Sequence, residues 1–327
     1  MTDRKLYVVS NTTSAQITPV TVPAGTVGSS TTSPLGSTWT AAIRPQGDYV
    51  YFTDGDNVAL AEYRVSDGVV TATVSIGSSD YVTVSPDGTR AYVIGKGGGQ
   101  TLRYYTLPGL GTGSTFGTQG SNDQDIAISP DGTTAYVTDY NSGCVYKFST
   151  SSTAVTTLNN LLTNPAGIAI SPDGTILLVG TYFGQVYVVS TSTGSILKTL
   201  TVGSTPWSVG ISSLGVGVAN DGTTGQAWII TPLNASAVAT LATGSGPAAD
   251  AGQPATGPRP AISTDGSIAY IADNRRYVYP LNIGTGEWGT PIDMGSGYAP
   301  FALAVSPPSG PGGWGASDWA TDWQLVE

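Results

Sequence analysis

Two short acidic segments carry the side chains best suited to hold a cation. Asp54–Asn57 (DGDN) and Ser121–Asp125 (SNDQD) are rich in the carboxylate and amide oxygens that Ca²⁺ prefers. Neither segment has the spacing of a calcium loop with its closing Glu. We therefore interpret both as solvated turns, and we expect no metal site and no cofactor.

The residues that most enzymes use for acid–base and nucleophilic chemistry are scarce. The chain has no histidine, the usual general base, the commonest metal ligand and a member of the Ser-His-Asp triad. Acid–base catalysis would have to rest on Asp, Glu or Tyr alone. The single cysteine, Cys144, excludes an internal disulfide, and its position in an apparent strand favours core packing over reactivity. We expect a protein that is not an enzyme and has no catalytic residues.

Charge and hydropathy exclude further classes of protein. Twelve basic and 22 acidic residues give a formal net charge of −10, and the basic residues form no patch that could hold nucleic acid. No apolar run is long enough to span a membrane, and the N-terminal MTDRKLYVVSN does not look like a secretory signal. We expect no nucleic-acid partner and no membrane insertion. The 44 Gly and 21 Pro residues also interrupt the chain too often for long helices.

Internal repeats predict the elements that position these residues. The segment Ile126–Gly132 (IAISPDG) recurs at 168–174 and, as VTVSPDG, at 82–88. Looser copies bring the total to seven, with the proline position at residues 45, 86, 130, 172, 213, 264 and 307. The average interval of about 44 residues is typical of one four-stranded blade of a β-propeller.

Within each repeat the strands follow a constant order. A short apolar first strand leads into the Pro-Asp-Gly turn, and a second strand such as Ala135–Thr138 follows. Third strands such as Gln185–Val189 look more alternating, which predicts half exposure, and a weaker fourth strand such as Ile196–Val202 closes the unit.

The two ends of the chain complement each other. Leu6–Asn11 and Ala15–Val22 resemble a second and a third strand without a first, whereas Pro300–Ser306 resembles a first strand with no partner after it. We expect an all-β, seven-bladed β-propeller of four-stranded antiparallel blades, with a ring closed by a blade shared between the N- and C-termini. The predicted domain covers residues 1–307, with the shared blade made of 1–30 and 298–307, and 308–327 form a Trp-rich tail.

The repeat motif resembles a known family. Ser-Pro-Asp-Gly followed by Ala-Tyr-Val-Thr-Asp at 129–139, and Tyr-Val-Val-Ser-Asn at 7–11, are similar to the YVTN family of seven-bladed propeller repeats. The resemblance extends over almost the whole chain and is weakest in the repeats around 45 and 213. It implies the fold and a cell-surface setting, and it implies little about chemistry because propellers serve many functions.

The aspartates of the repeated turns have a structural explanation. An Asp side chain in such a turn accepts hydrogen bonds from the backbone two residues further on. We therefore interpret Asp87, Asp131, Asp173 and Asp265 as turn residues and not as a ring of metal-binding carboxylates.

One face of the propeller is a candidate surface for a ligand or partner. The loops that enter the first strands and the turns that join second to third strands should share this face. It would carry aromatic residues together with a few arginines, which suit sugar rings or a protein partner. The candidate residues are Trp39, Tyr140, Tyr182, Phe183, Trp207, Arg259, Arg275, Arg276 and Tyr298.

The tail offers a second candidate contact. Trp314, Trp319 and Trp323 lie among small and acidic residues, and they would pack either on the chain's own propeller or on a neighbouring subunit. Sparse charge and no histidine favour a structural or adhesive binding module in a larger assembly, such as a tail or receptor-contacting part of a phage virion. The expected partners are protein subunits of that assembly or a surface glycan. A cytoplasmic protein-interaction propeller and, less favoured, a lactonase- or lyase-like enzyme are the alternatives.

Overall fold

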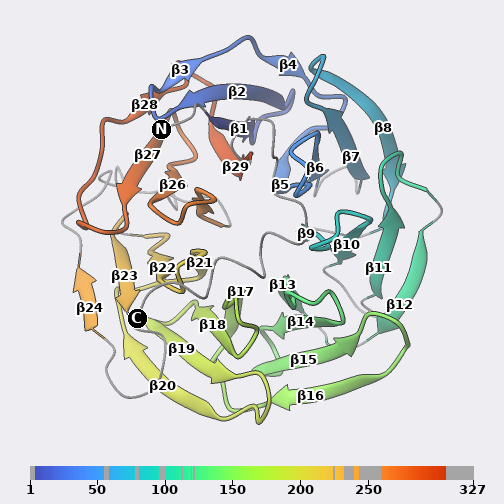
Figure 1. The fold of residues 1–327 in the computed structure, drawn as a ribbon, viewed down its shortest axis with the longest axis vertical. Coiled ribbons are helices and arrows are strands. Elements are labelled where there is room, and N and C mark those ends of the chain that lie inside the picture. Colours follow the sequence, from blue (N-terminus) through green and yellow to red (C-terminus); the bar gives the residue numbers. More distant parts are fainter. Residues whose placement is uncertain are drawn as a thin grey trace.

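The strands form seven antiparallel sheets around a central axis, a seven-bladed β-propeller (Figure 1). The computed structural model describes residues 4–54, 59–77, 81–95, 101–111, 113–118, 120, 122–223, 225–231, 239–242 and 259–306. These residues contain no helix, and so none that could span a membrane. The predicted all-β propeller is confirmed.

Six blades are continuous in sequence. Blade 1 consists of β5 (Thr38–Ile43), β6 (Tyr49–Asp54), β7 (Ala59–Arg64) and β8 (Val69–Ser75), and blade 2 of β9 (Tyr81–Val84), β10 (Arg90–Ile94), β11 (Thr101–Thr106) and β12 (Ser114–Thr118). Blade 3 consists of β13 (Asp123–Ile128), β14 (Thr134–Asp139), β15 (Cys144–Ser149) and β16 (Val155–Asn159), and blade 4 of β17 (Pro165–Ile170), β18 (Ile176–Thr181), β19 (Gln185–Ser190) and β20 (Ile196–Thr201). Blade 5 consists of β21 (Ser208–Ile211), β22 (Gly217–Asn220), β23 (Ala227–Thr231) and β24 (Ala239–Ala242), and blade 6 of β25 (Ala261–Ile262), β26 (Ile268–Ala272), β27 (Tyr277–Asn282) and β28 (Ile292–Asp293).

Blade 7 is built from both ends of the chain. Its innermost strand, β29 (Pro300–Val305), pairs antiparallel with β1 (Arg4–Ser10), so that Leu6 lies opposite Val305. β1 then pairs with β2 (Gln16–Val22), and the two short strands β3 (Thr26–Val27) and β4 (Thr31–Thr32) take the outer position. The predicted ring closure is confirmed, and the tail with its tryptophans lies outside the described residues.

Burial within the blades differs from the sequence expectation, and in blade 1 the second strand β6 is more buried than the innermost strand β5. Most third strands are largely buried, as in β19, although β27 has only two buried residues, and the fourth strand β8 alternates strictly between exposed and half-buried residues. The expectation of a half-exposed third strand is therefore wrong for β7, β15, β19 and β23, and it holds for β27. The third strand is covered because neighbouring blades pack against both of its faces, and only the fourth strand reaches the rim.

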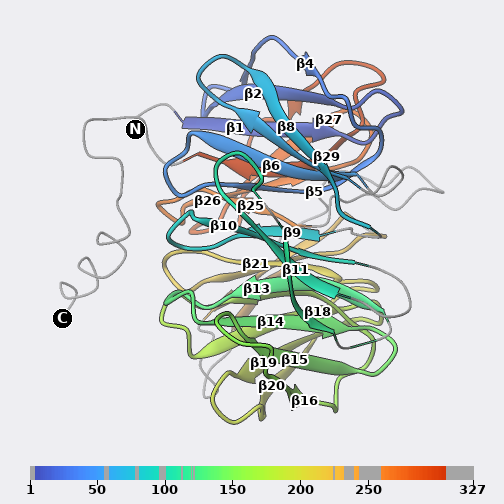
Figure 2. The same cartoon turned by 90° about the vertical axis from the view of Figure 1, so that its right-hand side faces the viewer.

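The core lies between the blades. A cluster of buried side chains fills the space between every two neighbours around the ring. Cys144 is buried in the cluster between blades 2 and 3, as predicted. The side view shows the blades packed beside one another around the ring (Figure 2). Because each sheet buries both faces against its neighbours, no blade is stable on its own.

The repeated turns have the predicted chemistry. In blade 3, Asp131 Oδ1 accepts hydrogen bonds from the Thr133 amide at 3.0 Å and from Ser129 Oγ at 2.5 Å. Gly132 closes this turn with a φ of 71°. The corresponding hydrogen bonds recur at Asp87, Asp173 and Asp265.

The Pro-Asp-Gly turns mark one face of the ring, and the opposite face is called the entry face here. It carries the turns that join second to third strands and the loops that enter the first strands. These two sets of loops touch: the amide of Tyr140, in the turn after β14, donates to the carbonyl of Asn122, just before β13, at 2.9 Å. The predicted sharing of one face is confirmed.

Candidate binding site on the entry face

Three aromatic residues from different loops meet on the entry face. Tyr140 lies edge-on to Tyr182, with ring centroids 5.3 Å apart and an interplanar angle of 79°. Tyr182 in turn stacks on Trp207, at 5.7 Å and 17°. The three side chains are half-buried and come from the second–third strand turns of blades 3 and 4 and from the loop entering blade 5. We call Tyr140, Tyr182 and Trp207 the aromatic cluster.

Buried polar side chains fix the turns that carry the two tyrosines. Asp139, at the end of β14, accepts hydrogen bonds from the amides of Asn141 and Ser142 in the turn that begins with Tyr140. Thr181, at the end of β18, accepts from the amides of Phe183 and Gln185. The last residue of the second strand thus sets the geometry of each turn.

Two glycines of blade 4 let the Trp207 loop approach closely. The amide of Gly167 in β17 donates to the carbonyl of Trp207 at 2.8 Å. A Cβ on Gly167 would lie 2.4 Å from that carbonyl oxygen, and a Cβ on Gly180 would lie 2.3 Å from the carbonyl oxygen of Pro206. No real Cβ tolerates such contacts, so glycine at both positions is what allows Trp207 to reach Tyr182.

A chain of amide groups runs beside the aromatic cluster. The hydroxyl of Tyr182 donates to Gln124 Oε1 at 3.2 Å, and Gln124 Nε2 donates to Asn122 Oδ1 at 2.6 Å. Asn122 Nδ2 then donates to Asn141 Oδ1 at 3.5 Å. Burial and, next, the nearby Tyr140 and Asp125 raise the pKa of Tyr182 to about 12, so its hydroxyl keeps the proton that it donates.

The segment before and within β13 is therefore not the solvated turn that the sequence indicated. Asp123, Gln124 and Asp125 are all buried. The segment is buried because it lies at the start of β13, the innermost strand of blade 3. This strand packs between β9 of blade 2 and β17 of blade 4. Asp54, of the other acidic segment, is likewise buried and accepts from the Gly36 amide at 2.6 Å, while 55–57 lie outside the described residues.

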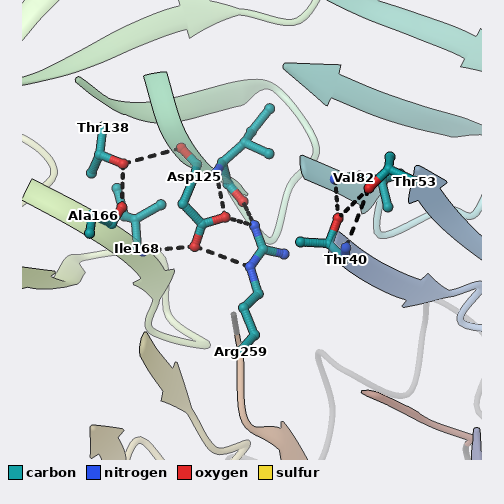
Figure 3. A network of polar contacts seen from close by, with 9 residues as sticks. Thr40, Thr53, Val82, Asp125, Thr138, Ala166, Ile168 and Arg259 are labelled. Carbon is teal, nitrogen blue, oxygen red and sulfur yellow. Dashed lines mark hydrogen bonds and ion pairs between the residues drawn. The ribbon is translucent and has the colours of Figure 1, made fainter. Parts of the chain in front are cut away.

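Asp125 is held by an arginine from a distant blade. Arg259 Nε donates to Asp125 Oδ2 at 3.1 Å, Arg259 Nη2 donates to Asp125 Oδ1, and Nη2 also donates to the Ile126 carbonyl at 2.6 Å. Asp125 further accepts from the Ile168 amide of blade 4 at 3.0 Å. Figure 3 shows the guanidinium group reaching Asp125 from the chain that leads into blade 6. The carboxylate is 1% exposed and the arginine side chain 22%.

The ion pair spans the centre of the ring. β13 and β25 are not neighbours: β17 and β21 lie between them on one side, and β9, β5 and β29 on the other. Asp125 and Arg259 both stand five residues before the proline position of their repeat. Thr40 has this position in blade 1, where its hydroxyl accepts from the Val82 amide of blade 2 at 2.9 Å (Figure 3). The side chain five residues before the proline position thus contacts another blade in all three repeats. The contact uses a carboxylate in Asp125, a guanidinium in Arg259 and a hydroxyl in Thr40.

A second buried carboxyl group, that of Asp123, lies in the same strand as Asp125. Asp123 faces Asp139 across the β13–β14 pair, and a Cβ on Gly120 would lie 2.2 Å from Asp123 Oδ1 and 2.7 Å from Asp139 Oδ2. Burial and, next, the charge of Asp139 raise the pKa of Asp123 to about 8. Burial beside Asp139 therefore favours the protonated form of Asp123 in the folded protein. The described residues contain no group of three or more His, Cys, Asp or Glu side chains arranged to hold a metal ion.

Two large apolar side chains are exposed in the loops next to the aromatic cluster, which are the turn after β18 and the loop that enters blade 4. Phe183, in the turn next to Tyr182, is 59% exposed, and Leu161, in the loop entering blade 4, is 73% exposed. That loop is tied to the Tyr140 turn, because Asn164 Nδ2 donates to the Tyr140 carbonyl at 3.3 Å. Exposed apolar side chains therefore lie in the turn that carries Tyr182 and in a loop hydrogen-bonded to the Tyr140 turn.

The other predicted surface residues do not join this cluster. Trp39 is half-buried and edge-on to Phe301, at 6.1 Å, on the side of blades 1 and 7. Arg275 lies in the second–third strand turn of blade 6, and its neighbour Arg276 pairs with Asp293 at 2.6 Å. The expected single surface of nine residues is thus divided into separate parts of the entry face.

Tyr298 does not belong to an exposed surface. It is 7% exposed, and its hydroxyl contacts Thr18 Oγ1 at 2.6 Å and donates to the carbonyl of Val8 at 2.7 Å. It joins the loop before β29 to β1 and β2. The prediction of a binding role for Tyr298 fails because this side chain fills the shared blade.

Sequence reasoning missed the polar residues that organise the site. The sequence pattern places Gln124 and Asp125 in an acidic turn, and it does not distinguish Gly167 and Gly180 from the many other glycines. One signal was available: Asp125 and Arg259 are opposite charges at the same position of two repeats, in strands that are otherwise small and apolar.

Comparisons with known proteins support the fold. No protein-family model and no curated protein matches the chain. The crystal structure of a functionally unknown protein from Desulfotomaculum acetoxidans is similar, with a TM-score of 0.77 and 16% identity over 93% of this chain and 99% of the other. Kuenenia stuttgartiensis hydrazine synthase is similar with a TM-score of 0.65 and 17% identity, over 77% of this chain and 78% of the other. At these identities the likeness shows the propeller fold alone, and membership of the YVTN family stays a prediction.

Proposed function

We propose that the protein is a non-enzymatic binding propeller that contacts its partner through the entry face of blades 3 to 5. The observation that carries this proposal is the aromatic cluster with exposed Phe183 and Leu161 beside it. Clustered tyrosine and tryptophan with neighbouring exposed apolar groups are typical of recognition surfaces. The structural or adhesive setting, such as a virion or another surface assembly, belongs to the same proposal and is supported by the sparse charge of the chain.

The carboxyl groups near the channel support binding over catalysis. Asp125 is committed to Arg259 and to two backbone amides, so it is not placed to accept a proton from a substrate. Asp123 is buried beside Asp139 under Gly120. One structural neighbour is an enzyme, but that likeness concerns the fold, and propellers of one shape serve unrelated functions.

The test is site-specific photo-crosslinking in the organism or particle that carries the protein. A photoreactive phenylalanine analogue at position 183 should form an adduct with another molecule, and Trp207→Ala should abolish that adduct. Leu214, 64% exposed in the first–second strand turn of blade 5, provides the matched control on the opposite face. Adducts from 214 but none from 183 would place the binding surface elsewhere and overturn the proposal.

A further inference from the structure

We propose that the aromatic cluster and its amide chain form a binding site for an uncharged carbohydrate. This inference rests on the proposed function and names the ligand class for the same corner of the entry face. It is carried by three features of the site: aromatic rings, amide groups at fixed positions, and the absence of an available positive charge among its described residues.

The rings suit the apolar side of a sugar. The C–H groups on one face of a pyranose carry partial positive charge and pack against the negative face of an aromatic ring. Trp207 and Tyr182 provide two nearly parallel ring systems, with Tyr140 edge-on beside them. Exposed Phe183 extends the aromatic surface within the same turn as Tyr182.

The amides suit the hydroxyl groups of a sugar. Each amide side chain offers both a donor and an acceptor, which a hydroxyl can satisfy simultaneously. The chain Tyr182–Gln124–Asn122–Asn141 holds these groups in fixed orientations beside the rings. Asn141, at its end, is exposed, and Asn122 is half-buried. A ligand with several hydroxyls would therefore meet groups that are already oriented.

The charges of the corner favour a neutral ligand. Arg259, the arginine beside Asp125, is committed to that carboxylate. Asp139 is engaged by the amides of its own turn. No described side chain of the cluster or its amide chain carries a positive charge, and the chain as a whole has a formal net charge of −10. An acidic glycan or a nucleic acid would be repelled rather than attracted.

The experiment uses the full chain on a glycan array, followed by calorimetric titration. The array carries neutral gluco-, manno-, galacto- and N-acetylhexosamine oligosaccharides beside sialylated and sulfated counterparts. We expect binding to at least one neutral series and none that requires sialyl or sulfate groups. Titration with the best neutral ligand should show a loss of affinity of tenfold or more for Trp207→Ala and a smaller loss for Tyr182→Phe, which keeps the ring and removes the hydroxyl.

A matched variant separates a local effect from a general one. Trp288 packs edge-on against Tyr279 in blade 6, at 6.3 Å, and Trp288→Ala should leave glycan affinity within twofold of the wild type. Far-ultraviolet circular dichroism and thermal unfolding verify that each variant is folded. If Trp207→Ala does not fold, Asn141→Ala, an exposed substitution, provides the same comparison with a smaller expected loss.

The outcomes also separate this inference from the proposed function. No binding to any neutral glycan, together with a Trp207-dependent protein adduct from position 183, would overturn the carbohydrate class and leave the binding face in place. Glycan binding that is unaffected by Trp207→Ala and Asn141→Ala would overturn the site. Binding only to sulfated or sialylated glycans would contradict the argument from charge.

Discussion

Arg259 and Asp125 stand at the same position of two different repeats, and their side chains meet across the central axis of the ring. The pair joins blade 6 to blade 3, which share no boundary, and Asp125 also binds the Ile168 amide of blade 4. The hydrophobic clusters of the described residues each join two neighbouring blades. This ion pair, in contrast, connects two blades on opposite sides of the ring.

Removing the arginine should destabilise the propeller. Arg259→Met leaves the buried Asp125 carboxylate without its counter-ion, and we expect the free energy of unfolding to fall by about 2–4 kcal/mol in urea titrations. The double variant Asp125→Asn/Arg259→Met, which removes both charges, should recover at least half of that loss. If Arg259→Met were as stable as the wild type, the ion pair would not contribute to the stability of the ring.

Gly180 should be intolerant of a methyl group. A Cβ there would lie 2.3 Å from the Pro206 carbonyl oxygen, so the loop carrying Trp207 must shift. We expect Gly180→Ala to lower the free energy of unfolding by about 1–3 kcal/mol and to change the fluorescence of Trp207. Gly284→Ala is the control, because a Cβ at Gly284 would meet only Asn282 Oδ1 at 3.5 Å. Equal effects of the two substitutions would contradict the proposed close approach.

Asp123 should make stability depend on pH in a defined direction. The folded pKa is raised to about 8 from the ordinary value of 3.8, so folding favours the protonated form. Its contribution is complete below the unfolded pKa and is lost as pH rises from about 4 to about 8. Asp123→Asn, which stays neutral, should be more stable than the wild type at pH 8 by about 5 kcal/mol.

The measurement for Asp123 is thermal and urea unfolding of both proteins between pH 4 and pH 9. The advantage of the Asn variant should shrink toward pH 4 and level off above pH 8. A difference between the two proteins that stays constant with pH would show that Asp123 does not titrate in this range.

Glu62 should hold blades 1 and 2 together. This glutamate is 2% exposed, and Oε2 accepts from Tyr51 Oη at 2.9 Å and from the Gly109 amide of blade 2 at 2.6 Å. Glu62→Ala leaves those donors unsatisfied, which should cost about 2–4 kcal/mol of stability. Glu287→Ala, at an exposed site, should change the free energy of unfolding by less than about 0.5 kcal/mol. Hydrogen exchange of the Gly109 loop provides an independent readout, and no change there would contradict the assigned contact.

Tyr298 should affect stability and not binding. Tyr298→Phe removes the hydroxyl that contacts Thr18 and the Val8 carbonyl, and we expect a loss of about 1–2 kcal/mol in unfolding experiments. Affinity for the entry-face ligand should stay unchanged, because the side chain is buried in blade 7. A loss of ligand affinity without a loss of stability would restore Tyr298 to the binding surface.

The sequence alone determined the architecture, because a propeller repeats one local pattern seven times. The spacing of the Ser-Pro-Asp-Gly turns, the apolar strands beside them and the complementary ends of the chain predicted the blades, the role of Asp131 and its equivalents, and the pairing of β1 with β29. These features depend on residues close together in the chain or on periodicity, and both are readable from one sequence.

The tertiary structure decided what local patterns do not contain. Asp125 looks like a solvated acid until the ring closes and brings Arg259 to it from a blade more than 100 residues away. Tyr140, Tyr182 and Trp207 become one cluster because glycines at 167 and 180 let adjacent blades approach, whereas Tyr298 is buried by the strands of the opposite chain end. Burial and partners across the ring depend on which residues the closed fold places side by side, and sequence spacing carries no measure of that distance.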